Sequence, residues 1–246
     1  MDSKNFYKTI LDQISNDCSI SNIQIGQSWV ITSLQDGRTG MAAKMFDRLS
    51  LPINEIMQQY PTAHMLANQI DTNDLFISTL ALSAINACNN SHEDIIENHL
   101  EFDKRELCTT GLSLDNKTLG IIGHMKRTYD LINASCSPKK IYMFDMDETK
   151  GDYPAESEPA LLPECDVVII TATTLINHTI TDVITWSEDA YKILYGPSAP
   201  LLESVPGIDR ICGYYIFDKT AALQWNSENK GSPLLFCNPF KIDLDL

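Results

Sequence analysis

Polar residues directly follow four apolar runs in the second half of the chain, at the points where buried strands would end. The residues at these positions include Gly123, His124, Asp145, Thr173, Thr174, Asn177, His178, Gly196, Pro197 and Ser198. In an open parallel sheet, ligands bind outside the carboxyl ends of the strands, where the strand order reverses. The spacing of the runs therefore predicts one ligand site built from several loops.

Two of these residues have the chemistry of a nucleotide site. The turn at Gly123 precedes a helical segment, and the first N–H groups of a helix suit an anion. Asp145 ends the second run, the position from which a dinucleotide enzyme binds a ribose hydroxyl. Of the Gly-x-Gly-x-x-Gly fingerprint, however, only Gly120 and Gly123 are present. A nucleotide- or S-adenosylmethionine-dependent enzyme is therefore kept as the alternative function.

Two histidines and one carboxylate form a candidate metal site if the strand order is the doubly wound 2-1-3-4-5. In that order the first and third strands are neighbours, so His124 and His178 would lie near Asp145. Two imidazoles and a carboxylate suit a divalent transition metal. The alternative, which we prefer, is that each histidine is a separate loop residue.

Other polar residues have competing structural explanations. Thr179 and Asp182 have the spacing of a capping box, so we expect Thr179 to start a helix. Asn177 lies just before that helix and is the better ligand candidate. Asn86 falls in a buried helix, where its amide must find partners, and a hydrogen bond to a neighbouring loop is the preferred explanation. Ser198 lies in a rigid turn. We give equal weight to two alternatives: that its hydroxyl faces the crevice, and that the residue only forms the turn.

The elements that position these residues change along the chain. After residue 117, apolar runs alternate with helical segments, which predicts a Rossmann-like, doubly wound parallel sheet. The run at 166–170 is β-branched and typical of a strand buried on both faces. The first part instead combines an amphipathic opening helix, short strands between residues 23 and 46, and an apolar helix at 74–88.

This change of pattern predicts an α/β protein with two domains. We expect a small α+β domain at residues 1–100 and a Rossmann-like domain at residues 101–246. The polar stretch from 89 to 105 is the expected linker between them.

The composition argues against several classes of function. The 33 acidic residues outnumber the 18 basic ones, and the resulting net charge of −15 makes a nucleic-acid partner unexpected. No apolar stretch approaches the roughly 20 residues that span a bilayer, and no signal-peptide pattern is present, so we expect a cytoplasmic protein without a membrane partner. The seven cysteines include no Cys-x-x-Cys pair and are expected to be reduced thiols. A homo-oligomer is compatible with this composition.

Five segments resemble the family of putative heavy-metal chelation domains. They are IGQSW at 25–29, INA at 85–87, LGIIG at 119–123, CDVVIITATTLIN at 165–177 and GPSAPL at 196–201. The resemblance covers nearly the whole chain and keeps the order of the segments. It implies a Rossmann-like domain preceded by a small domain similar to the enolase N-terminal fold, with a metal or small-ligand site in the cleft between them.

The resemblance also implies which residues line that cleft. They are Thr173, Thr174, Asn177, Gly196, Pro197 and Ser198 from the second domain, and Gly26, Trp29 and Asn86 from the first. The chain departs from the family at His124 and Met125, where aromatic residues would be expected, and at Asp145, where a longer Glu would be expected. Both departures alter the floor of the implied pocket.

The sequence thus predicts a protein that binds a small ligand, a heavy metal or a metal chelate between two domains. A divalent transition metal is the candidate cofactor, and the sequence leaves open whether the protein is also an enzyme. The nucleotide-dependent enzyme is the second hypothesis. A structural partner-binding protein is the third, and it would show a large apolar surface patch and no polar cleft.

Overall fold

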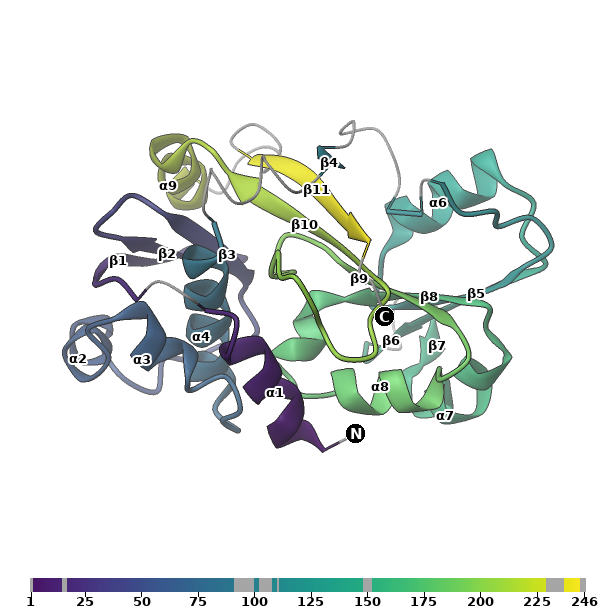
Figure 1. Ribbon diagram of the computed structural model, residues 1–246, viewed down its shortest axis with the longest axis horizontal. Helices are drawn as coiled ribbons and strands as arrows, with labels where there is room; N and C mark the ends of the chain where they lie inside the picture. The colour runs from purple at the N-terminus through teal and green to yellow at the C-terminus, as the bar shows by residue number, and fades with distance from the viewer. Residues whose placement is uncertain are drawn as a thin grey trace.

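The described residues form two sheets, one of three strands and one of eight. The computed structural model describes residues 2–14, 17–90, 100–101, 108–109, 111–147, 152–228 and 237–243. Most of the predicted linker lies outside these residues. Figure 1 shows the small sheet with its helices at one end of the molecule and the large sheet running away from it.

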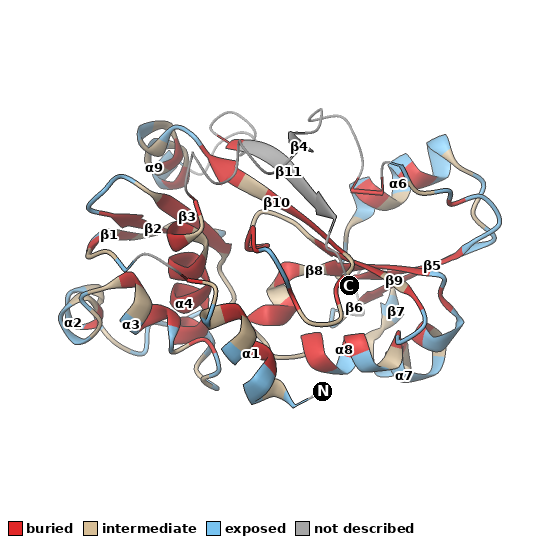
Figure 2. Ribbon diagram, viewed as in Figure 1, coloured by how far each residue is buried: buried red, intermediate tan, exposed pale blue. Residues whose placement is uncertain are grey.

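The first half of the chain forms the small antiparallel sheet and the helices that pack on it. These elements are α1 (Ser3–Leu11), β1 (Ile20–Ile25), β2 (Trp29–Leu34), β3 (Thr39–Ala43), α2 (Ile53–Gln59), α3 (Ala63–Ala67) and α4 (Leu75–Cys88). The predicted opening helix and apolar helix are confirmed as α1 and α4. Helix α4 begins at Asp74, whose carboxylate accepts the N–H of Phe76 at 2.9 Å. Its side chains are buried nearly all round, because α4 lies between the small sheet and the second half of the chain (Figure 2).

The second half forms the eight-stranded sheet, in the order β4-β11-β10-β9-β8-β5-β6-β7. The strands are β4 (Leu100–Glu101), β5 (Thr118–Ile122), β6 (Lys140–Asp145), β7 (Tyr153–Pro154), β8 (Val167–Thr171), β9 (Tyr191–Tyr195), β10 (Arg210–Ile216) and β11 (Cys237–Asp243). The strands from β10 to β7 in this order are parallel, and β11 and β4 add an antiparallel edge. The five predicted strands are β5, β6, β8, β9 and β10, and their order is the predicted 2-1-3-4-5. The doubly wound α/β fold is therefore confirmed.

Helices cover both faces of the large sheet, which explains why its strands are continuous apolar runs. They are α6 (Lys126–Ser135), α7 (Glu158–Leu161) and α8 (Ile180–Trp186), with short 3-10 turns η2 (Ala155–Ser157), η3 (Leu162–Glu164) and η4 (Ala172–Leu175). Leu119 and Ile121 of β5 share one core with α6, whereas Ile122 belongs to the core formed with α8. Figure 1 shows α6 on one side of the sheet and α7 and α8 on the other.

The chain returns to the small sheet after β10. Helix α9 (Lys219–Glu228) packs on β2 and β1, and the rings of Trp225 and Trp29 lie 6.4 Å apart. The small sheet is thus covered by α4 on one face and by α9, from the second half of the chain, on the other. The two halves are therefore interlocked rather than merely adjacent.

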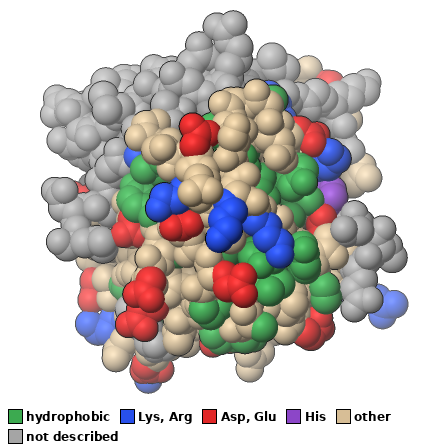
Figure 3. All heavy atoms as spheres, turned by 90° about the vertical axis from the view of Figure 1, so that its right-hand side faces the viewer, with side chains coloured by type: hydrophobic (Ala, Val, Ile, Leu, Met, Phe, Trp, Pro, Cys, Tyr) green, Lys and Arg blue, Asp and Glu red, His purple; other side chains and the backbone are tan. Residues whose placement is uncertain are grey.

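The surface mixes charges of both signs. Figure 3 shows Lys and Arg side chains beside Asp and Glu side chains on one face. Ion pairs among the described residues include Lys117 with Asp166 and Lys126 with Asp130. Among the described helices, none has the length and apolar character that crossing a membrane requires.

Candidate ligand-binding site

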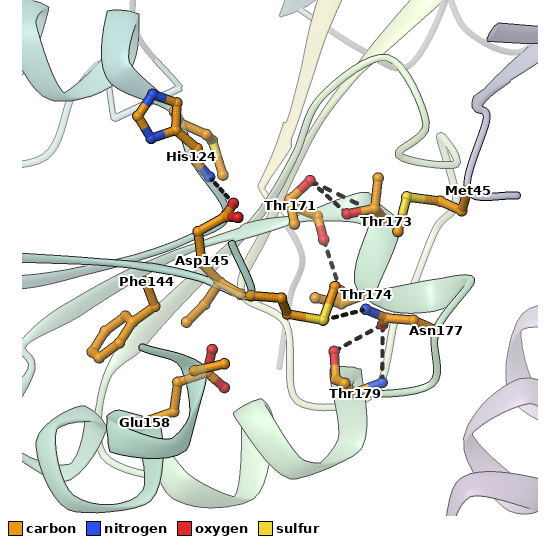
Figure 4. Close-up of a pocket in the computed structure, with 15 residues that line it drawn as sticks. Met45, His124, Phe144, Asp145, Glu158, Thr171, Thr173, Thr174, Asn177 and Thr179 are labelled. Carbon is orange, nitrogen blue, oxygen red and sulfur yellow. Dashed lines mark hydrogen bonds between the residues drawn. The ribbon is translucent and has the colours of Figure 1, made fainter. Parts of the chain in front are cut away.

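A cavity of about 360 Å³ opens at the carboxyl ends of β5, β6 and β8. Its apolar walls are formed by Met45, Ile122, Met125, Phe144, Met146 and Ala155. The predicted site residues that line it are Gly123, His124, Asp145, Thr173, Thr174 and Asn177 (Figure 4). The structure therefore brings six residues from three strand ends to one hollow.

The strand order explains why the hollow is there. From the end of β5 the chain leaves through α6 toward β6 over one face of the sheet, whereas from the end of the neighbouring strand β8 it leaves through α8 toward β9 over the other face. The two connections diverge at the strand ends and leave a crevice, the usual ligand position in a doubly wound sheet. Among the described residues of the first half of the chain, only Met45, which follows β3, lines this cavity. The cavity thus lies at the junction of the two halves.

Hydroxyl and amide groups after β8 form the polar wall. The hydroxyl oxygens of Thr171 and Thr173 lie 3.1 Å apart, and the Thr174 hydroxyl donates to the Thr171 carbonyl at 2.7 Å. The Asn177 side-chain oxygen accepts the Thr179 hydroxyl at 2.9 Å. Thr179 lies at the start of α8 as predicted, but the predicted capping box is wrong, because the Thr179 hydroxyl donates to Asn177 and makes no capping bond to α8.

The Asp145 carboxylate binds backbone N–H groups of its own loop and of the loop after β5. One carboxylate oxygen accepts the backbone N–H of His124 and the other accepts that of Asp147, both at 2.8 Å. These bonds fix the turn after β5, where Gly123 has a φ of 93°. The His124 ring lies beside Asp152, with Nδ1 2.6 Å from a carboxylate oxygen. The geometry gives Asp145 a positioning role in the cavity wall.

His178 does not reach the cavity. Its Nδ1 lies 3.0 Å from the Tyr7 hydroxyl of α1, and its Nε2 lies 2.7 Å from the Thr72 carbonyl. Its backbone has a φ of 64°, which turns the side chain toward α1. Both ring nitrogens are therefore used in joining the two halves of the chain.

Glu158 is a cavity residue that the sequence did not indicate. It begins α7, lines the cavity and is only 7% exposed. Burial, together with the carboxylates of Glu156 and Asp182, raises the pKa of Glu158 to about 7. Its local sequence resembles an ordinary turn, and its burial depends on the packing of α7 against α8.

The predicted residues 196–198 lie outside this cavity and form part of the junction instead. Ser198 is buried, and its hydroxyl oxygen accepts the N–H of Ala43 at 2.9 Å. Ala43 is the last residue of β3. The Asn86 amide donates to the carbonyls of Met41 at 2.7 Å and of Ser198 at 3.0 Å. These three bonds tie β3, α4 and the loop after β9 together, so the preferred explanation for Asn86 agrees with its geometry.

Replacing Ser198 with alanine is expected to lower the free energy of unfolding by about 1–2 kcal/mol, because the N–H of the half-buried Ala43 loses its acceptor. Urea unfolding measures the loss. Ser227→Ala is the matched control, since that serine is exposed on α9 and bonds only within its own helix. An unchanged midpoint for Ser198→Ala would contradict a structural role for this hydroxyl.

Gly26 and Trp29 pack against α9 and do not line the cavity. A side chain at Gly26 would meet Asn226, whose Cγ lies 2.7 Å from the position of an added Cβ. Trp29 faces Trp225, as described above. The structure gives both residues a packing environment.

The donor atoms around the cavity do not fit a bare heavy-metal ion. Within the described ranges, no group of three or more His, Cys, Asp or Glu side chains is arranged to hold a metal. The thiolates that soft metals prefer are absent from the described lining residues. The predicted trio of His124, Asp145 and His178 is not assembled, because the His178 ring faces Tyr7 and Thr72.

Two family descriptions match the chain, and both read "Putative heavy-metal chelation". One matches residues 109–238, which form most of the large sheet and the cavity, and the other matches residues 7–89. The chain belongs to the heavy-metal chelation family. The family resemblance stated from the sequence is therefore confirmed.

Known proteins resemble this chain in sequence and in fold. An uncharacterised protein of Methanocaldococcus jannaschii is 30% identical over 188 residues, which cover 72% of this chain and 67% of that protein. A crystal structure from Desulfitobacterium hafniense has a TM-score of 0.83 at 19% identity and covers 98% of both chains. One from Pyrococcus horikoshii has a TM-score of 0.76 at 18% identity, covering 99% of this chain and 100% of that one. Both crystal structures are described as proteins of unknown function.

Proposed function

We propose that this protein binds a small molecule or a metal chelate in the cavity at the ends of β5, β6 and β8. The observation that carries the proposal is the cavity itself, which lies at the switch point of the sheet. Its volume of about 360 Å³ is in the range of ligand pockets, and apolar walls alternate with a few hydroxyl, amide and carboxyl groups. Membership of the heavy-metal chelation family supports a metal in the ligand.

A metal bound in this way would bring most of its own ligands. The described lining residues offer two carboxylates and one imidazole, and Asp145 and His124 already have protein partners. A chelate has its coordination sites filled by an organic molecule, so it needs from the protein only shape, charge and hydrogen bonds. The proposed division at 1–100 and 101–246 would place Met45 of the first domain against this ligand.

Metal retention tests the proposal. The protein is dialysed against Co²⁺, Ni²⁺, Cu²⁺ or Zn²⁺, each alone and with ethylenediamine, and metal per chain is measured by mass spectrometry. We expect retention near one metal per chain for at least one ethylenediamine complex, and much less for the ions alone. Retention of a bare ion at one per chain would contradict chelate binding. Failure to retain any ethylenediamine complex would contradict it as well.

A blocked cavity supplies the control for location. Thr173→Phe fills the cavity and is expected to abolish retention of the complex. Thr185→Phe makes the same change at an exposed position on α8 and is expected to leave retention unchanged. Equal retention by both variants would exclude the cavity as the site. Thermal stabilisation by NAD, NADP or S-adenosylmethionine would instead favour the nucleotide-dependent enzyme.

A further inference from the structure

The Glu158 carboxylate has no partner among the residues that the structure describes. It forms no hydrogen bond or ion pair with any described residue, although the residue is only 7% exposed. Figure 4 shows its carboxylate directed from α7 toward the end of the cavity where Asp145 lies. Buried carboxylates are normally paired, because desolvation of an unpaired charge is costly. The missing partner is therefore expected to arrive with the ligand.

The surroundings of Glu158 select the charge of that partner. The exposed carboxylates of Glu156 on η2 and Asp182 on α8 lie close enough to repel its charge, and Asp145 at the end of β6 lines the same cavity. Lysine and arginine are absent from the described lining residues. The imidazole of His124 is held beside Asp152. The cavity thus has an excess of negative charge, which favours a cation.

The opposite walls select the rest of the ligand. Met45, Phe144, Met146 and Ile122 present apolar surface to the cavity. Thr171, Thr173 and Thr174 already bond to one another, so they add few free donors. A ligand with an apolar body and one charged end satisfies both kinds of wall.

We infer that Glu158 binds a protonated amine of a ligand whose apolar body lies against the methionine and phenylalanine side chains of the cavity. This inference rests on the proposed function and names the chemical class of its ligand. It applies equally to a free amine and to a cationic amine chelate of a metal. Because the carboxyl titrates near neutral pH, amine binding depends on pH between 6 and 8.

Calorimetric titration with 2-phenylethylamine and its neutral analogue 2-phenylethanol tests the inference. At pH 8 we expect the amine to bind at least tenfold more tightly than the alcohol, as an ion-paired hydrogen bond in a buried site requires. Between pH 8 and pH 6 the ionised fraction of a group with pKa about 7 falls about tenfold, and amine affinity is expected to fall with it. The alcohol should bind equally at both pH values.

Three variants separate the role of Glu158 from general damage. Glu158→Gln is expected to weaken amine binding at least tenfold and to remove its pH dependence, with alcohol binding unchanged. Glu158→Asp keeps the charge and should retain the preference for the amine. Glu203→Gln removes the same charge at an exposed position away from the cavity and should change the affinity less than twofold.

Equal affinity for amine and alcohol, or an unchanged amine affinity in Glu158→Gln, would overturn the inference. Either result would leave the proposed function intact, since the cavity would still bind both compounds. If neither compound binds, the inference also fails, and the metal-retention measurement decides the proposed function independently.

Discussion

Replacing Gly40 with alanine is expected to reduce the free energy of unfolding by about 3 kcal/mol or more, because an added Cβ has no space. On β3, Gly40 lies directly against the backbone of α4. A Cβ there would collide with backbone atoms of Ala87 and Asn86 and would lie 2.6 Å from the Ser83 carbonyl oxygen. Backbone atoms inside a helix cannot move aside as a flexible side chain can. Urea unfolding, or the yield of folded protein if the variant does not fold, measures the effect.

Gly37→Ala is the matched control for this experiment. Gly37 lies in the turn before β3 with a φ of 97°, and an added Cβ there would meet nothing within 4 Å. Its cost is backbone strain alone, about 1 kcal/mol. If Gly40→Ala were no more destabilising than Gly37→Ala, β3 could not pack on α4 as described. Because β3 leads directly to Met45, the same packing also positions a wall of the cavity.

Glu158→Gln is expected to stabilise the ligand-free protein at pH 8 and to have little effect at pH 5. The native carboxyl has a pKa of about 7, against an ordinary value of 4.5, so the folded protein holds this proton more tightly than the unfolded chain. The contribution of this carboxyl to the free energy of unfolding is therefore fully present below pH about 4.5, and it is lost as the pH rises through 7. Glutamine has the same shape without the charge, so it avoids the loss.

The expected gain at pH 8 is about 2 kcal/mol, which is less than the full pKa difference implies because the cavity is open to solvent. Urea unfolding at pH 5 and pH 8 measures it, with Glu203→Gln, at an exposed position away from the cavity, as the control for removing a negative charge. A Glu158→Gln variant that is less stable than the original protein at pH 8 would show that the carboxylate has a favourable partner. If Glu158→Gln is more stable at pH 8 and also binds the amine more weakly, Glu158 serves binding and lowers the stability of the ligand-free protein.

The central strands could be predicted because their signal is local. The runs in β5, β6, β8 and β9 are apolar and bounded by turns, and burial on both faces of a parallel sheet requires that pattern. The alternation of strands and helices then restricts the strand order. Edge strand β7 has two residues, too few for any pattern, and the position of α9 against the small sheet depends on contacts between distant segments.

The candidate site could be predicted only in part, for the same reason. Gly123, Asp145 and Asn177 follow strands, so topology alone brings them to one edge of the sheet. The direction of a side chain is not fixed by topology, and His178 points toward α1 because its backbone adopts a left-handed conformation. Glu158 was missed because its burial arises from the packing of α7. The proposed domain division and the likeness of the first half to the enolase N-terminal fold remain predictions.

Methyl NMR of the methionines tests most directly whether the strand-end cavity is the ligand site. Met45, Met125 and Met146 line the cavity, whereas Met57 on α2 and Met65 on α3 do not. The protein is labelled at the methionine methyl carbons and titrated with 2-phenylethylamine and with the nickel–ethylenediamine complex. The account predicts that the three cavity methyl signals shift or broaden first, and that those of Met57 and Met65 stay in place. Changes confined to Met57 and Met65, or saturated binding that leaves all three cavity signals unmoved, would contradict it.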